Sequence, residues 1–209
     1  MSTLYNLPNV LTFSRIVLIP FLVLFFYLPV KWGMAAATLV FVLAALTDWL
    51  DGYLARRWDQ TSPLGAFLDP VADKLMVATA LVLIVQADPE FWLALPAVVI
   101  IGREIAISAL REWMAELGAR ANVAVSEIGK VKTAAQMVAI ALLIYRDDVW
   151  GLPVYTIGLV LLYIAVLLTL WSMVIYLRAA WPQLNGEGET VALPKGDEIG
   201  LTHSKDSIE

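Results

Sequence analysis

Apolar stretches of about 20 residues follow one another along this chain and restrict what it can fold into. A helix of that length spans the hydrocarbon core of a bilayer, which is roughly 30 Å thick. Hydrophobic residues make up 60% of the 209 residues and charged residues only 16%, unlike a soluble domain. The sequence therefore predicts an all-α integral membrane protein. Its six transmembrane helices are expected over residues 11–28, 34–54, 67–85, 92–110, 128–145 and 154–177.

The charges of the connecting segments predict the orientation of these helices. Most arginines and lysines lie after the second and fourth stretches and near the end of the sixth, whereas the other connections are mainly acidic. Because basic loops stay on the cytoplasmic side, both termini are expected in the cytoplasm. Residues 183–209 mix Gly, Pro, Ser and charges without periodicity. We therefore expect a membrane domain over residues 1–182 and a disordered polar tail over 183–209.

The residues that the chain lacks narrow its chemistry. It has no cysteine, and its single histidine, His203, lies in the polar tail. Thiol nucleophiles, zinc–thiolate sites and histidine bases are thereby excluded, so acid–base chemistry falls to Asp, Glu, Lys or Tyr. The part of the chain before the tail is nearly neutral, so we expect no binding of nucleic acid, which requires a basic surface.

Four aspartates stand in and beside the second and third apolar stretches. They belong to a pattern of eight residues: Asp48, Asp51, Gly52, Ala55, Arg56, Gly65, Asp69 and Asp73. Carboxylates at membrane depth are costly and mark a functional site by default. Four of them close together cannot all stay ionised unless a cation lies between them. Because Asp oxygens suit hard cations, the pattern predicts a site for Mg²⁺ or Mn²⁺.

Helical spacing brings these aspartates onto two surfaces that can face each other. The first four positions of the pattern fall at i, i+3, i+4 and i+7 of one helix, which is one face. Asp69 and Asp73 share a face of the next helix, and a short connection makes the two helices antiparallel neighbours. Two metal ions about 3.5–4 Å apart, bridged by such carboxylates, would clamp a phosphoryl group during in-line displacement. Without a nearby histidine, one carboxylate must act as the general base.

The pattern of eight residues resembles the signature of the CDP-alcohol phosphatidyltransferases, D-x2-D-G-x2-A-R-x8-G-x3-D-x3-D, and the likeness extends over about residues 6–178. It implies a homodimeric enzyme of the bacterial cytoplasmic membrane, and the loop charges predict that its active site faces the cytoplasm. It further implies two divalent ions, Mg²⁺ or Mn²⁺, and a donor lipid, CDP-diacylglycerol. The implied metal ligands are Asp48, Asp51, Asp69 and Asp73, with Asp73 also as the base. The implied CDP cradle is Gly52, Ala55, Arg56 and Gly65.

Residues 6–20, 103–118 and 129–133 resemble the branch of this family whose acceptor is sn-glycerol 3-phosphate. A dianionic acceptor needs cations, and four lie around the connection between the fourth and fifth stretches: Arg103, Arg111, Lys130 and Lys132. Arg103 and Arg111 are eight residues apart and share roughly one helix face. Two alternatives stay open: the two lysines could instead set the membrane topology, and Arg103 could pair with Glu104 or Glu127.

Two polar residues of the first apolar stretch, Thr12 and Arg15, are also expected to form polar interactions. Arg15 lies at membrane depth and needs an anion, which is either a carboxylate of the aspartate pattern or a lipid phosphate. Thr12, one turn earlier, is a candidate contact of the CDP nucleotide, or else serves helix capping or packing.

The expected reaction moves the phosphatidyl group of CDP-diacylglycerol to sn-glycerol 3-phosphate and releases CMP. Another acceptor alcohol, such as serine, inositol phosphate or a second phosphatidylglycerol, would use the same chemistry. A cation transporter with intramembrane aspartates is the alternative from another class, but such proteins tend to carry inverted repeats. No such repeat is apparent in this sequence.

Overall fold

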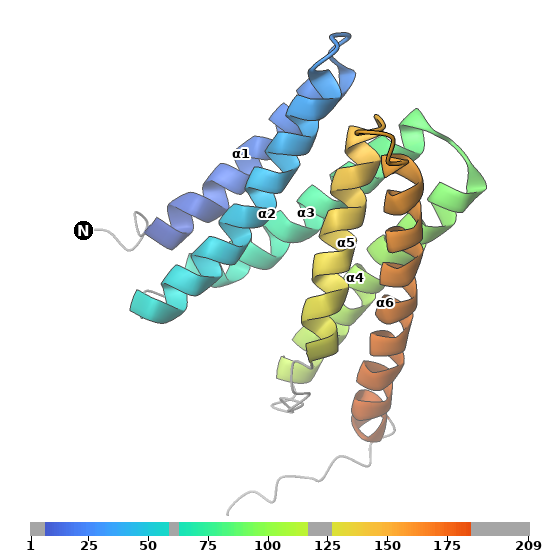
Figure 1. Ribbon diagram of the computed structural model, residues 1–209. Helices are drawn as coiled ribbons and strands as arrows, with labels where there is room; N and C mark the ends of the chain where they lie inside the picture. Colours follow the sequence, from blue (N-terminus) through green and yellow to red (C-terminus); the bar gives the residue numbers. More distant parts are fainter. Residues whose placement is uncertain (1–6, 59–62, 117–126, 185–209) are drawn as a thin grey trace, which may run out of the picture.

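The computed structural model describes residues 7–58, 63–116 and 127–184, and within these ranges the chain forms six helices (Figure 1). They are α1 (Leu7–Tyr27), α2 (Gly33–Trp58), α3 (Pro63–Ala87), α4 (Phe91–Glu116), α5 (Glu127–Tyr145) and α6 (Val154–Leu184). Each predicted apolar stretch coincides with one of these helices, so the prediction of an all-α protein is confirmed for the described residues. The predicted tail lies outside them, apart from the last two residues of α6.

Most of the helices run past the predicted apolar stretch at the same end of the bundle. α1 and α3 begin earlier than predicted, and α2, α4 and α6 end later. Hydropathy marks only the part of a helix that lipid surrounds, whereas backbone hydrogen bonding continues into the polar segment. The pattern of aspartates lies toward this extended end.

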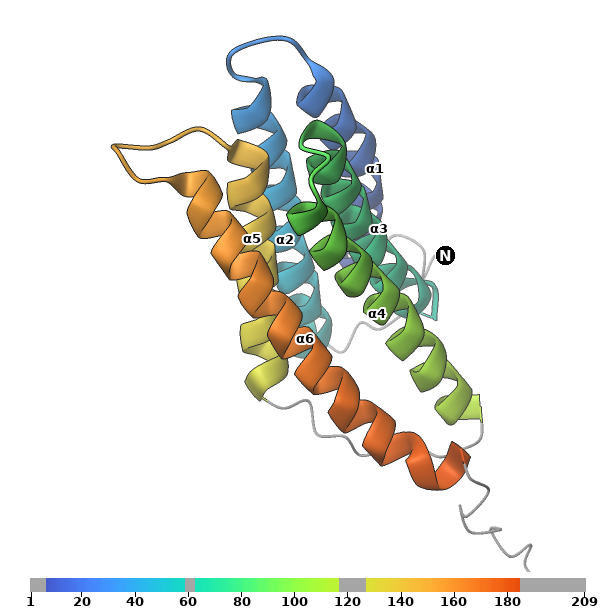
Figure 2. The same ribbon diagram turned by 90° about the vertical axis from the view of Figure 1, so that its right-hand side faces the viewer.

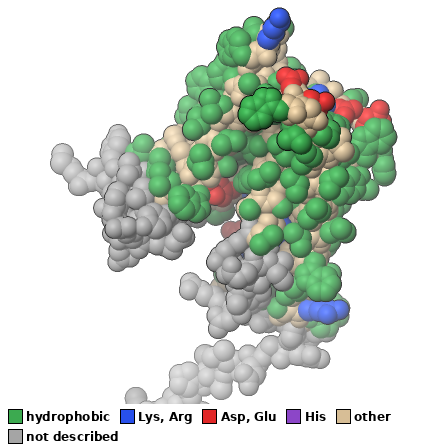
Figure 3. Space-filling view, in the orientation of Figure 1, with side chains coloured by type: hydrophobic (Ala, Val, Ile, Leu, Met, Phe, Trp, Pro, Cys, Tyr) green, Lys and Arg blue, Asp and Glu red, His purple; other side chains and the backbone are tan. Residues whose placement is uncertain are grey.

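Four of the six helices are long and apolar enough to cross a bilayer. Their spanning segments are Val10–Tyr27, Gly33–Leu50, Phe91–Glu116 and Val154–Trp181. The apolar part of α5, Val131–Tyr145, is shorter, and α3 carries Asp69, Asp73 and Lys74 in its first half. Hydrophobic side chains are also abundant on the face of the molecule shown in Figure 3. The chain is therefore a multi-pass membrane protein, while six crossings and cytoplasmic termini stay predictions.

The packing of α1 decides how the acidic helices meet. α1 packs against both α2 and α3, and α3 in turn contacts α2, α4 and α5 (Figures 1 and 2). Small buried residues line these contacts, with Ala37 and Ala44 on α2 and Ala80 on α3, and they let the helices approach closely. The polar half of α1 thereby faces the acidic residues of its two neighbours.

A second polar cluster connects helix ends at the end of the bundle opposite the aspartate pattern. The hydroxyl of Tyr155 donates a hydrogen bond to Asp88, which also forms an ion pair with Arg146 at 3.7 Å. The guanidinium of Arg146 lies 5.7 Å from the centre of the Tyr155 ring. Arg146 has a φ of +63° and ends α5 in the left-handed conformation that commonly terminates helices. This cluster joins the ends of α3, α5 and α6.

Candidate active site

Arg15 of α1 connects the acidic residues of α2 and α3. Its side chain is only 2% exposed, and its Nη1 donates to Oδ1 of Asp48 at 2.9 Å and to a carboxylate oxygen of Asp73. Of the two partners that the sequence left open for Arg15, the structure shows the carboxylates. A buried guanidinium offsets the charge of acids that would otherwise be costly at this depth.

Thr12 of α1 forms a hydrogen bond with Asp69, the third aspartate of the pattern whose side chain the structure describes. It is 1% exposed, and its hydroxyl donates to Oδ1 of Asp69 on α3. Thr12 and Arg15 are three residues apart on α1, and their partners Asp69 and Asp73 are four apart on α3, so one face of α1 holds both acids. The hydroxyl of Thr12 is thus engaged with a carboxylate, and its contact with the nucleotide stays a prediction.

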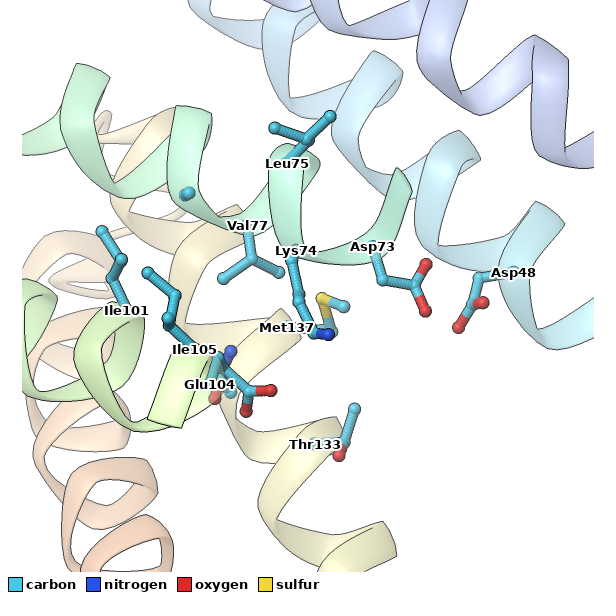
Figure 4. Close-up of a pocket in the computed structure, with 12 residues that line it drawn as sticks. Asp48, Asp73, Lys74, Leu75, Val77, Ile101, Glu104, Ile105, Thr133 and Met137 are labelled. Carbon is cyan, nitrogen blue, oxygen red and sulfur yellow. The ribbon is translucent and has the colours of Figure 1, made fainter. Parts of the chain in front are cut away.

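Asp48 and Asp73 point toward one another at the edge of a cavity of about 340 Å³ (Figure 4). We call it the central cavity. It lies among α2, α3, α4 and α5, and its lining includes Asp48, Asp73, Glu104, Thr133, Gln136 and Met137. The side chains of Asp48 and Asp73 are 35% and 37% exposed, so their carboxylates reach the open space of the cavity. A ligand in the cavity can therefore contact both acids.

Several predicted residues can be placed only on the backbone. Asp51, Gly52, Ala55 and Arg56 fall in the last turns of α2, but their side chains lie outside the described part. Gly65 is buried in the first turn of α3. Among the described side chains, no group of three acids has the spacing of a metal site. The full set of four aspartates therefore stays a prediction that includes Asp51.

At the opposite side of the central cavity, Glu104 of α4 joins two of the predicted cations. Its Oε1 accepts hydrogen bonds from Nζ of Lys132 at 2.8 Å and from Nη1 of Arg103 at 3.1 Å. Nη2 of Arg103 also donates to the hydroxyl of Ser172 on α6 at 2.8 Å. Lys132 is only 5% exposed. Of the two acids considered as partners of Arg103, the structure shows Glu104; the side chain of Glu127 lies outside the described part.

The other two predicted cations are not part of this cluster as described. Arg111 is exposed, whereas Lys132 is buried and pairs with Glu104; none of Arg103, Arg111 and Lys132 lines the central cavity itself. Eight residues along a helix correspond to an angular offset of about 80°, so Arg111 is turned away from Arg103. The side chain of Lys130 lies outside the described residues. The structure therefore brings Arg103 and Lys132 together and leaves Arg111 apart.

An apolar groove, which the sequence analysis missed, adjoins the central cavity. It lies between α2 and α5, has a volume of about 700 Å³, and shares Asp48, Thr133 and Met137 with the cavity. Its apolar lining includes Phe41, Ala45, Trp49, Ala134, Val138 and Ala141. The signal for it in the sequence is weak, because small residues such as Ala45 and Ala141 are common in any packed membrane helix.

Comparison with known proteins decides the family. The family model for CDP-alcohol phosphatidyltransferase matches residues 5–171. The chain belongs to this family. Two similar curated proteins, from Shigella flexneri serotype 5b (strain 8401) and Escherichia coli (strain K12), are each called CDP-diacylglycerol–glycerol-3-phosphate 3-phosphatidyltransferase. Each is 58% identical over 176 residues, which is 84% of this chain and 95% of the relative.

The CDP-alcohol phosphatidyltransferase family uses divalent metal ions, and the chemistry of this site is compatible with them. Asp48 and Asp73 offer oxygen ligands from two helices at the edge of an open cavity. Such ligands suit Mg²⁺ and Mn²⁺, which usually bind through a few carboxylates together with substrate phosphates. Asp69 lies one turn before Asp73 on α3, and Asp51 follows Asp48 on the same face of α2. The residues present therefore fit the expected ions.

Replacing Arg15 by methionine should destabilise the protein when divalent metals are absent. Asp48 and Asp73 would lose a buried counter-charge. Because both carboxylates are about one-third exposed, we expect a loss of about 1–3 kcal/mol, below the cost of breaking a fully buried pair. Thermal unfolding in detergent with chelator measures the effect, and Arg178→Met, at an exposed position, is the matched control. Equal melting temperatures for the two variants would contradict the assignment.

Proposed function

We propose that this protein transfers the phosphatidyl group of CDP-diacylglycerol to sn-glycerol 3-phosphate and releases CMP. The observation that carries the proposal is the central cavity, which has Asp48 and Asp73 at one side and Glu104 at the other, where Glu104 pairs with Arg103 and Lys132 behind the lining. Such a cavity can receive a small anionic alcohol beside a general base. The relatives at 58% identity are called by the name of this reaction.

The donor lipid would approach through the groove between α2 and α5. This groove is apolar along most of its length and reaches Asp48, so acyl chains lying in it would bring the diphosphate to the carboxylates. The CDP part would be held by Gly52, Ala55, Arg56, Gly65 and Thr12. The small residues leave room for a flat ligand, and the planar fork of Arg56 suits a phosphate.

Asp73 would act as the general base of the transfer. Its carboxylate reaches the cavity and would take the proton from the 1-hydroxyl of the acceptor. The oxygen then attacks the β-phosphorus of CDP-diacylglycerol, a new phosphorus–oxygen bond forms, and the bond to CMP breaks. The hydrogen bond from Arg15 orients Asp73 for this proton transfer.

Two divalent ions, Mg²⁺ or Mn²⁺, would be held by Asp48, Asp51, Asp69 and Asp73. When bound, such ions offset the negative charge that develops on the diphosphate and on CMP. Thr12 and Arg15 of α1 fix the positions of Asp69 and Asp73 from behind, which keeps the carboxylates of α3 in one register.

The phosphate of the acceptor would bind at the cations on the other side of the cavity. Lys132 and Arg103 carry two positive charges against the single charge of Glu104, which leaves a net positive charge for a phosphate. Lys130 and Arg111 remain further candidate ligands. In the cell, we place the enzyme in the bacterial cytoplasmic membrane as a homodimer whose active site faces the cytoplasm.

Asp73→Asn should stop turnover while leaving the binding of CDP-diacylglycerol largely intact. Asparagine keeps the shape of the side chain but cannot accept the proton, and a general base contributes about 10²- to 10⁴-fold to rate. CMP release measures turnover, and titration calorimetry measures binding. Asp147→Asn, at an exposed position beyond α5, is the matched control and should behave as the wild type. Normal product formation by Asp73→Asn would remove the base assignment.

Removal of divalent metals tests the function as a whole. Purified protein should release CMP from CDP-diacylglycerol with sn-glycerol 3-phosphate in Mg²⁺ or Mn²⁺, lose this activity in chelator, and regain it when either ion returns. Serine and inositol phosphate should give no lipid product. Undiminished activity in chelator would contradict the metal mechanism. A product from serine alone would overturn the proposed acceptor.

A further inference from the structure

Gln136 is a buried polar residue of the central cavity that the mechanism above does not use. It lies on α5, is 4% exposed, and contributes to the lining of the cavity. Among the described residues its Oε1 accepts no hydrogen bond. Burying an amide oxygen without a hydrogen-bond donor costs about 1–3 kcal/mol of stability. A ligand that donates a hydrogen bond to Gln136 would remove this cost.

The three acids of the cavity already have partners. Asp48 and Asp73 bind Arg15, and Glu104 accepts hydrogen bonds from Lys132 and Arg103. Of the polar residues that line the described part of the cavity, Gln136 is the one with a buried oxygen that accepts no hydrogen bond. A partner for this oxygen must be a hydrogen-bond donor, which excludes a phosphate dianion and an acyl chain.

The position of Gln136 along α5 relates it to the acceptor. It follows Lys132 by four residues, so the two side chains share a helix face and stand about 6 Å apart along the helix axis. That separation is on the scale of a three-carbon alcohol phosphate. Asp73 and Gln136 both line the central cavity, so an acceptor with its reacting hydroxyl at Asp73 can reach Gln136 with the neighbouring hydroxyl.

We infer that the amide of Gln136 accepts a hydrogen bond from the 2-hydroxyl of the acceptor and thereby makes the enzyme selective for a vicinal diol phosphate. This inference rests on the proposed function, because it assigns a specificity residue to the same acceptor site. A site that is built to bind a hydroxyl rejects an analogue that lacks it, since the buried polar group is then left unpaired.

The test compares two acceptors on the wild-type protein. One is sn-glycerol 3-phosphate, and the other is 3-hydroxypropyl phosphate, which keeps the phosphate and the reacting primary hydroxyl but lacks the 2-hydroxyl. We expect kcat/KM to be roughly 10-fold or more higher for the diol, as measured by CMP release. Equal values for the two acceptors would overturn the inference without any mutation. Absence of turnover with sn-glycerol 3-phosphate would instead overturn the proposed function.

A substitution then assigns the preference to Gln136. Gln136→Met keeps the length of the side chain and removes the amide, so the diol should lose its advantage while kcat/KM for the deoxy analogue changes little. KM for CDP-diacylglycerol should stay as in the wild type. Thr169→Val is the matched control, since it removes another fully buried oxygen that accepts no hydrogen bond among the described residues but lies outside the cavity lining.

Three results would contradict the role of Gln136. An unchanged preference for the diol in Gln136→Met would show that another group recognises the 2-hydroxyl. An equal loss with both acceptors would indicate a structural role. A raised KM for CDP-diacylglycerol with an unchanged acceptor ratio would place the amide against the nucleotide instead.

Discussion

A buried guanidinium between carboxylates of two helices is the interaction on which this structure depends. Charged side chains at membrane depth are tolerated only where other charges or polar groups satisfy them. Arg15 of α1 meets this requirement for Asp48 of α2 and Asp73 of α3, and Thr12 does the same for Asp69. α1 thus determines how the acidic faces of its two neighbours meet, although it contributes no residue to the eight-residue pattern.

The central cavity has two chemically different sides. Asp48 of α2 and Asp73 of α3 stand on one side, and Glu104 of α4 stands on the other (Figure 4). Glu104 pairs with Arg103 and Lys132. The apolar groove between α2 and α5 joins the cavity at Asp48. A site of this kind offers both apolar and polar surfaces next to the same carboxylate, Asp48.

Much of the fold could be predicted from the sequence, because an apolar stretch of bilayer length has few alternatives to forming a transmembrane helix. The i, i+3, i+4 spacing of the aspartates likewise assigned Asp48 and Asp73 to helix faces that meet. The partner of Arg15 could not be predicted, since a carboxylate and a lipid phosphate satisfy a guanidinium equally well. Helix spacing predicted that Arg111 shares roughly one face with Arg103, but the offset of about 80° between them leaves Arg111 on the exposed surface. The ion pair between Glu104 and Lys132 depends on how α4 and α5 pack, which a single sequence does not encode locally.

We propose that carboxylates of α2 and α3 meet around bound divalent cations at the edge of this cavity. Anomalous diffraction from crystals of the protein grown with Mn²⁺ tests it most directly, because Mn²⁺ is located independently of any activity. We expect anomalous peaks within bonding distance of Asp48 and Asp73, with Asp51 and Asp69 completing the ligand set. Peaks elsewhere, or carboxylates that bind no ion at saturating Mn²⁺, would contradict it.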